Sequence, residues 1–122
     1  MTIAEVANKW LEFCKTGEYE KAQTELYDNK CVSQEMEGVQ GYPEKVEGME
    51  DIKFKGKQWN SLVEELHSTE IEGLFVAGNH FTATMKMDIK MKGMPRSINE
   101  QVAVFQVEKG KIVKEQFFYP LQ

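Results

Sequence analysis

The feature that most constrains the fold of this chain is a hairpin near its C-terminal end, residues 98–119. Two runs rich in β-branched and aromatic residues flank a short polar turn at residues 108–111, which contains Gly110. The first run is apolar at every position from Val102 to Phe105, and therefore on both of its alternating faces. A strand with one solvated face would alternate with polar residues. The pattern predicts a central strand that is covered on both sides.

The composition limits the class of protein. The 122 residues fit one domain, 1–122, which is large enough to bury a core. Charged residues make up 29% of the chain and the net charge is −5, which argues against a surface for nucleic acid. No apolar run approaches the roughly 20 residues that span a bilayer. We expect neither nucleic acid nor a membrane as a partner.

The N-terminal residues and the cysteines predict a cytoplasmic protein. Glu5, Lys9 and Glu12 interrupt the apolar core that a signal peptide would need. Cys14 and Cys31 lack the spacing of metal ligands, and Cys14 falls on the apolar face of the first predicted helix, where it acts as a small hydrophobe. We expect no metal site and no cofactor.

Two helices are predicted at the start of the chain. Residues 2–16 repeat apolar side chains at spacings of three and four, which is typical of an amphipathic helix. Thr2 and Glu5 match a capping box at its start, and Gly17 is a stop signal. A second short helix is predicted at residues 18–26.

The next segment is predicted as a turn at residues 27–30, a short strand at 31–35 and a loop at 36–47. The loop contains two glycines and a proline, and its length fits either a lid over a binding site or a solvated crossing. A third helix is predicted from Gly48. Gly56 inside it costs about 1 kcal/mol relative to alanine, and we expect close backbone packing to account for it.

Antiparallel strands make up the remainder of the predicted fold. One strand is expected at residues 66–77 and a second at 80–92, joined by a Gly-Asn turn. The second strand alternates apolar and polar side chains over most of its length, which is a clear strand signal. With the hairpin, this order of elements predicts an α+β fold with helices on one face of the sheet.

Three segments together resemble a known superfamily. WLEFCKTGEYE (10–20) resembles the two opening helices of nuclear-transport-factor-2-like domains, EGMEDI (47–52) the start of their third helix, and GKIV (110–113) their closing hairpin. The best match within this superfamily is the SnoaL-like family. The resemblance covers essentially the whole chain. It implies a cone-shaped α+β domain with three helices on a curved, mixed, mainly antiparallel sheet, a fold that hosts many functions.

The resemblance to ketosteroid isomerases does not extend to their chemistry. Counting from Gly17, their oxyanion tyrosine falls on Trp10 and their aspartate base falls on Gln34. An amide cannot act as a general base near neutral pH. Their second oxyanion acid would fall near Val102 or Ala103, neither of which is acidic. The isomerase mechanism is therefore not supported.

SnoaL-like cyclases use a pocket carboxylate and an imidazole, and the resemblance suggests Glu115, Glu35 and His67 for these roles. The implied pocket face of the last strand carries Glu115 and Val113, and apolar surroundings would raise a carboxyl pKa there. Alternatively, Glu115 is a glutamate at the edge of the sheet that pairs with a lysine. Simple alternation points Glu35 away from the pocket, and a bulge or bend would bring it inside. His67 is alternatively a solvated histidine among glutamates.

The expected pocket wall is mostly apolar. Core packing is the competing explanation for the tryptophans and methionines, and it is compatible with lining a pocket. The predicted wall consists of Trp10, Trp59, Met85, Met87, Gln101, Phe117 and Tyr119.

Two functions remain open on the sequence. One is a pocket for a small apolar molecule, with acid–base chemistry that uses no cofactor, as in an isomerase, cyclase or hydrolase. The other is a non-catalytic binding or dimerisation domain whose cavity its own side chains fill. We also expect a homodimer through the outer face of the sheet, because the hairpin is apolar on both faces. The residues expected on that face are Ile98, Val102, Val104, Ile112 and Phe118.

Overall fold

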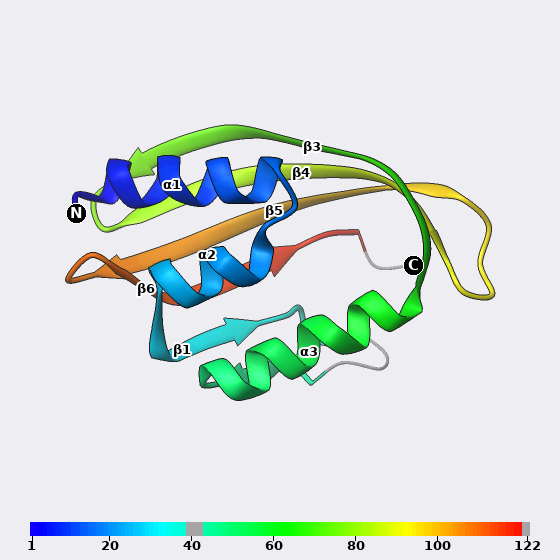
Figure 1. Cartoon of the computed structure of the whole chain (residues 1–122), viewed down its shortest axis with the longest axis horizontal. Helices are drawn as coiled ribbons and strands as arrows, with labels where there is room; N and C mark the ends of the chain where they lie inside the picture. Colours follow the sequence, from blue (N-terminus) through cyan, green and yellow to red (C-terminus); the bar gives the residue numbers. More distant parts are fainter. Residues whose placement is uncertain (39–42, 121–122) are drawn as a thin grey trace.

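The computed structural model describes residues 1–38 and 43–120, in which three helices pack on one sheet of six strands (Figure 1). This confirms the predicted α+β class and its cone-like arrangement. The helices are α1 (Ile3–Lys15), α2 (Tyr19–Leu26) and α3 (Met49–Leu62). The strands are β1 (Tyr27–Gln34), β2 (Lys45–Glu47), β3 (Val63–Ala77), β4 (His80–Met91), β5 (Ser97–Glu108) and β6 (Lys111–Phe118).

The sheet is mixed and mainly antiparallel, as expected. Its strand order is β2-β1-β6-β5-β4-β3, so the two strands of the predicted hairpin, β5 and β6, lie in its middle. Only β1 and β6 pair in parallel; the other neighbouring strands are antiparallel. In Figure 1, α1 lies along β3 and β4, and α3 lies beside β1. None of the helices in the described parts of the chain is long and apolar enough to cross a membrane.

The first helix begins and ends where its sequence predicts. The Glu5 amide donates to Thr2 Oγ1 at 3.1 Å, and the Thr2 amide donates to Glu5 Oε1 at 3.0 Å, which completes the capping box. Gly17 has a φ of +76°, a conformation that glycine adopts without strain and that ends the helix. The buried face of α1 carries Val6, Ala7, Trp10 and Cys14.

An aromatic cluster fixes α1 on the sheet. Phe81 and Phe105 are direct neighbours across β4 and β5, and their stacked rings have centroids 4.6 Å apart. The Trp10 ring is tilted relative to both rings, and its centroid lies 4.7 Å from the centroid of Phe105 and 6.0 Å from that of Phe81. Such aromatic pairs contribute about 0.5–1.5 kcal/mol beyond the area they bury. The cluster therefore packs α1 against the inner face of β4 and β5.

Three element boundaries differ from the sequence prediction. Residues 27–30 are the start of β1, because the backbone there continues into the strand that pairs with β6. Residues 45–47, predicted as part of a loop, form β2 and pair antiparallel with β1. The predicted lid at 36–47 includes residues 39–42, which lie outside the described residues. Strand β3 begins at Val63 rather than at residue 66, since Val63 already pairs with Met91.

The sequence prediction assigns the inner and outer faces of the hairpin correctly, except near a β-bulge in β6 that is described below. Ala103, Phe105 and Val107 are buried, whereas Val102 is 41% exposed, so within one chain β5 is covered on one face only. Ile112, expected on the outer face, is fully buried.

A register shift explains this error. Gln106 pairs with Lys114 but Val107 pairs with Ile112, which leaves Val113 as the extra residue of a β-bulge. The bulge places Ile112 and Glu115 on the same inner face although they are three residues apart. Val113, predicted to share the face of Glu115, is therefore out of phase with it.

Candidate functional site

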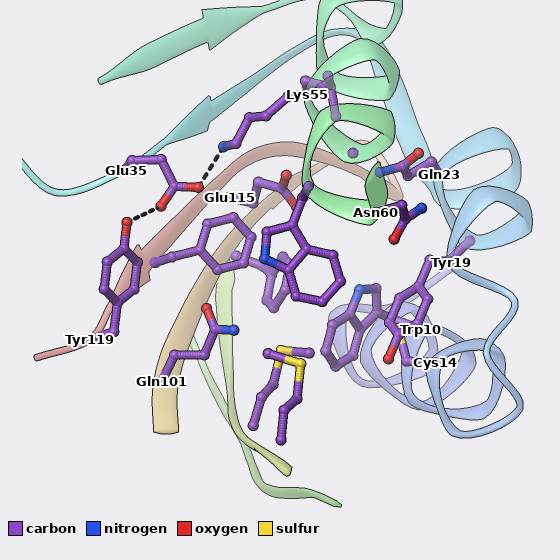
Figure 2. A pocket seen from close by; sticks show the side chains of 18 of the residues that line it. Trp10, Cys14, Tyr19, Gln23, Glu35, Lys55, Asn60, Gln101, Glu115 and Tyr119 are labelled. Atoms are coloured by element: carbon purple, nitrogen blue, oxygen red, sulfur yellow. Dashed lines mark hydrogen bonds and ion pairs between the residues drawn. The ribbon is translucent and has the colours of Figure 1, made fainter. Parts of the chain in front are cut away.

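The helices and the inner face of the sheet line a partly open cavity of about 450 Å³ (Figure 2). Its lining includes every residue predicted for the pocket wall, together with Glu35 and Glu115. Those wall residues are Trp10, Trp59, Met85, Met87, Gln101, Phe117 and Tyr119. Most of the remaining wall is also apolar, with Ile52, Leu66 and Phe105 among the lining residues. The space has the size and composition of a small-molecule site.

A buried ion pair lies at one end of the cavity. Lys55 Nζ lies 2.6 Å from Glu35 Oε1, and the Tyr119 hydroxyl donates to Glu35 Oε2 at 2.7 Å (Figure 2). The Lys55 and Glu35 side chains are only 14% and 11% exposed. Lys55 also donates to Ser33 Oγ at 2.9 Å, and its ammonium group lies 5.5 Å from the centre of the Phe117 ring. The Glu35 carboxylate is thus held in one position by two partners.

The position of Glu35 follows from the alternation of β1. Cys31 and Ser33 are the buried residues at the end of this strand, and Glu35 follows them in the same phase. The expectation that alternation points Glu35 away from the pocket was therefore wrong, and no bulge is needed at this point. Gln34, at the position of the ketosteroid isomerase base, has the opposite phase. The inward-facing carboxylate comes one residue later in this chain.

Glu115 is the second carboxyl group of the cavity, and it is 6% exposed. The Tyr27 hydroxyl donates to its Oε2 at 2.5 Å. Burial raises the pKa of Glu115 above its ordinary value, although hydrogen bonds from Tyr27 and Ser33 and the charge of Lys55 oppose this shift. A raised carboxyl pKa means that Glu115 keeps its proton to higher pH than a solvated glutamate does.

The other titratable groups near the cavity are less suited to proton transfer. Burial and the Glu115 charge raise the pKa of Tyr27 well above its usual value. Cys14 lines the cavity, but burial raises the pKa of its thiol to about 12, so it is a poor nucleophile near neutral pH. Both described cysteines, Cys14 and Cys31, are free and buried.

His67 does not join the two carboxyl groups. It lies on β3 outside the cavity lining, with its Nε2 3.4 Å from Glu65 Oε1. This arrangement matches the alternative of a solvated strand histidine. Within residues 1–38 and 43–120, no group of three or more His, Cys, Asp or Glu side chains could hold a metal ion.

Lys55, Tyr27 and Ser33 belong to the polar network but were not predicted from the sequence. Lys55 lies three residues after Ile52, so the helical period of α3 could have placed it on the inner face. Tyr27 is not predicted because the sequence of residues 27–30 is typical of a turn, whereas the structure places it at the start of β1. Ser33 carries no sequence signal of its own, because a serine in a strand is ordinary.

Gly56 also lines the cavity, and the reason predicted for it was wrong. Apart from its chain neighbours and the adjoining backbone of α3, a Cβ atom built at Gly56 would meet no atom within 4 Å. Close packing against a neighbouring backbone therefore does not account for a glycine in α3.

Comparison with known proteins gives one family and many similar structures. The family model of the SnoaL-like domain matches residues 1–119. A search of curated proteins finds no match.

Three solved structures illustrate the similarity. A candidate SnoaL-like polyketide cyclase from Mesorhizobium loti is 30% identical, with a TM-score of 0.90 over 98% of this chain and 100% of the other. An NTF2-like protein of unknown function from Burkholderia pseudomallei is 10% identical, with a TM-score of 0.81 over 98% of this chain and 92% of that one. A protein with a cystatin-like fold from Xanthomonas campestris is 16% identical, with a TM-score of 0.75 over 100% and 93% of the two chains.

Proposed function

Since this chain belongs to the SnoaL-like domain family, we propose that it binds a small apolar molecule in its cavity and acts on it by acid–base chemistry without a cofactor. The observation that carries this proposal is the presence of two differently held carboxyl groups, Glu35 and Glu115, in one apolar cavity. Carboxyl groups in unlike environments are a common basis for acid–base pairs.

Glu35 is the proposed base. Its carboxylate lines the cavity and is held in position by the Lys55 ammonium group and the Tyr119 hydroxyl. In the proposed step, a Glu35 oxygen takes a proton from a carbon next to a carbonyl group of the ligand. The C–H electron pair moves into the new enolate, and the proton remains on Glu35 until it returns to the ligand.

Glu115 is the proposed acid. Its raised pKa lets it keep a proton that it can donate to the enolate oxygen formed in this step, which gives a neutral enol. When Glu35 returns its proton to carbon, the enol O–H gives its proton back to Glu115 and the carbonyl group re-forms. Tyr27 then remains hydrogen-bonded to the Glu115 carboxyl group and holds it in place. Aromatic side chains around the cavity suit a flat apolar ligand, and the polyketide cyclase name of the Mesorhizobium loti protein agrees with an aromatic or polyketide-like compound.

The uncharged dye N-phenyl-1-naphthylamine is expected to bind in the cavity and quench the tryptophan emission, because Trp10 and Trp59 both line it. A titration followed by fluorescence measures this. Replacing Trp59 by phenylalanine should remove part of the quenching. Phe75→Ser is the control, because Phe75 is 72% exposed and does not line the cavity, and it should leave binding unchanged. Absence of quenching in the wild type would favour the non-catalytic association domain.

We also propose that the outer face of the sheet pairs with a second copy of the chain. Val102 and Phe118 are direct neighbours across β5 and β6 and are 41% and 42% exposed. Ile98, on the same face of β5, is 54% exposed. Glu100 lies between Ile98 and Val102 on this face, and it pairs across β4 and β5 with Lys86, which has the opposite charge. If this strip met the same strip of a second copy, apolar area would be buried. The opposite charges of Lys86 and Glu100 cancel, so the two strips would carry no net charge from this pair to repel each other.

Val104→Glu is expected to convert such a dimer to monomers, because it places a charge on the outer face of β5 directly beside Val102, the next outward residue along the strand. Sedimentation velocity at micromolar concentration measures the state. Gln106→Glu adds the same charge nearer the end of β5 and serves as the control that keeps the dimer. A wild-type monomer, or an unchanged dimer in Val104→Glu, would rule out this interface.

A further inference from the structure

Gly56 lies in the interior of α3, where glycine is a poor choice. In a helix interior it is about 1 kcal/mol less favourable than alanine, since its backbone loses more freedom on folding. The surrounding helix is otherwise regular from Met49 to Leu62. A glycine at such a position calls for a local reason.

The usual reasons do not apply at Gly56. Its backbone is helical, and it is not among the glycines with positive φ that turns require. Apart from its two chain neighbours and the adjoining backbone of α3, no atom lies within 4 Å of the place that a Cβ would occupy, so no other part of the fold needs the room. Without a ligand, the folded chain therefore has room for a side chain at Gly56.

The cavity lies on that side of the helix. Ile52 is four residues before Gly56, and Trp59 and Asn60 are three and four residues after it, so all four share one helical face. Each of them lines the cavity, and so does the neighbouring Lys55. The space left at Gly56 is therefore part of the ligand space, close along the helix to the Lys55–Glu35 pair.

We propose that Gly56 is a specificity-determining residue, which widens the cavity for the ring system of a flat polycyclic ligand. The inference rests on the proposed function, because it concerns the same cavity, and it adds the size class of the ligand. A ligand with several fused rings would fill the space beside Gly56. A smaller aromatic compound would bind without using it.

A series of variants with two probes of different size tests this proposal. The probes are 2-naphthol, with two fused rings, and 1-hydroxypyrene, with four. Gly56→Leu is expected to weaken binding of 1-hydroxypyrene at least about tenfold, since methylene-sized changes in such pockets alter binding by about 10- to 200-fold. Binding of 2-naphthol should change much less, because a ligand with two rings does not use the space beside Gly56. Fluorescence titration measures both affinities.

Gly56→Ala provides a second, ligand-independent readout. It should raise the folding equilibrium constant about fivefold, because alanine is the better helix former and the space is open. Gln58→Leu, at an exposed position of the same helix that does not line the cavity, is the control for added bulk. It should leave both affinities unchanged.

The outcomes separate the two proposals. If the wild type binds neither probe, the proposed function fails and this inference fails with it. If the wild type binds both probes and Gly56→Leu weakens them equally, or leaves both unchanged, Gly56 does not set ligand size while the binding function stands. If Gly56→Leu weakens the binding of 1-hydroxypyrene but not that of 2-naphthol, the inference is supported.

Discussion

Glu35→Gln is expected to slow the exchange of the α-protons of 2-tetralone with heavy water by about 10²–10⁴-fold, the usual contribution of a general base. This bicyclic ketone is apolar and carries exchangeable protons beside its carbonyl group. The amide of glutamine keeps the shape of Glu35 but cannot accept the proton. Proton NMR of the ketone with catalytic amounts of protein measures the exchange rate directly.

The matched variants separate chemistry from stability. Glu115→Gln should reduce the rate by a similar factor, because the neutral amide donates a hydrogen bond but no proton. Glu70→Gln, at an exposed position on β3, removes the same charge away from the cavity and should have no effect. All rates are compared below the melting temperature of the least stable variant. Wild-type rates in both Glu35→Gln and Glu115→Gln would show that neither residue carries the chemistry.

Lys55→Met is expected to lower the free energy of unfolding by about 3–5 kcal/mol, because it leaves the Glu35 carboxylate in the interior without its cation. Replacing both partners, in Lys55→Met combined with Glu35→Gln, should recover most of that loss, since no unpaired charge remains. Urea unfolding of the wild type, the two single variants and the double variant gives the coupling energy between the two residues.

The chain offers a control for this experiment in β2. Lys45 and Glu47 form an ion pair at 3.0 Å, but their side chains are 55% and 66% exposed. Such surface pairs contribute about 0–1 kcal/mol, so Lys45→Met should have little effect. If Lys55→Met costs no more than Lys45→Met, the buried pair does not stabilise the fold in the way we describe.

Local patterns in the sequence were sufficient to predict most of the fold. The alternation of β4 identifies its buried residues, and Thr2 with Glu5 identifies the start of α1. Both signals come from residues that are close together in the sequence, so they can be recognised without knowing the fold. The pocket wall followed from the family resemblance and from these same faces.

The errors arise where the phase of a strand depends on its partner. Val113 is the extra residue of a bulge, and this moves Ile112 to the interior. The bulge exists only in the pairing of β6 with β5, so alternation within β6 alone cannot reveal it. Lys55 likewise carries no local sign that it pairs with Glu35, because that contact joins a helix to the end of a strand.

The parallel pairing of β1 and β6 has a consequence for the order of folding. Tyr27 and Glu115 are separated by 88 residues, and Glu35 and Tyr119 by 84. The hydrogen bonds at the polar end of the cavity therefore link the N-terminal part of the chain to its C-terminal part. Contacts of such long sequence separation carry a large loop-closure entropy and tend to form after local hairpins. The β3–β4–β5 meander can assemble before β1 meets β6. Ligand binding at the carboxyl groups would then report the last step of folding, and refolding followed by a bound probe should lag behind refolding followed by strand formation.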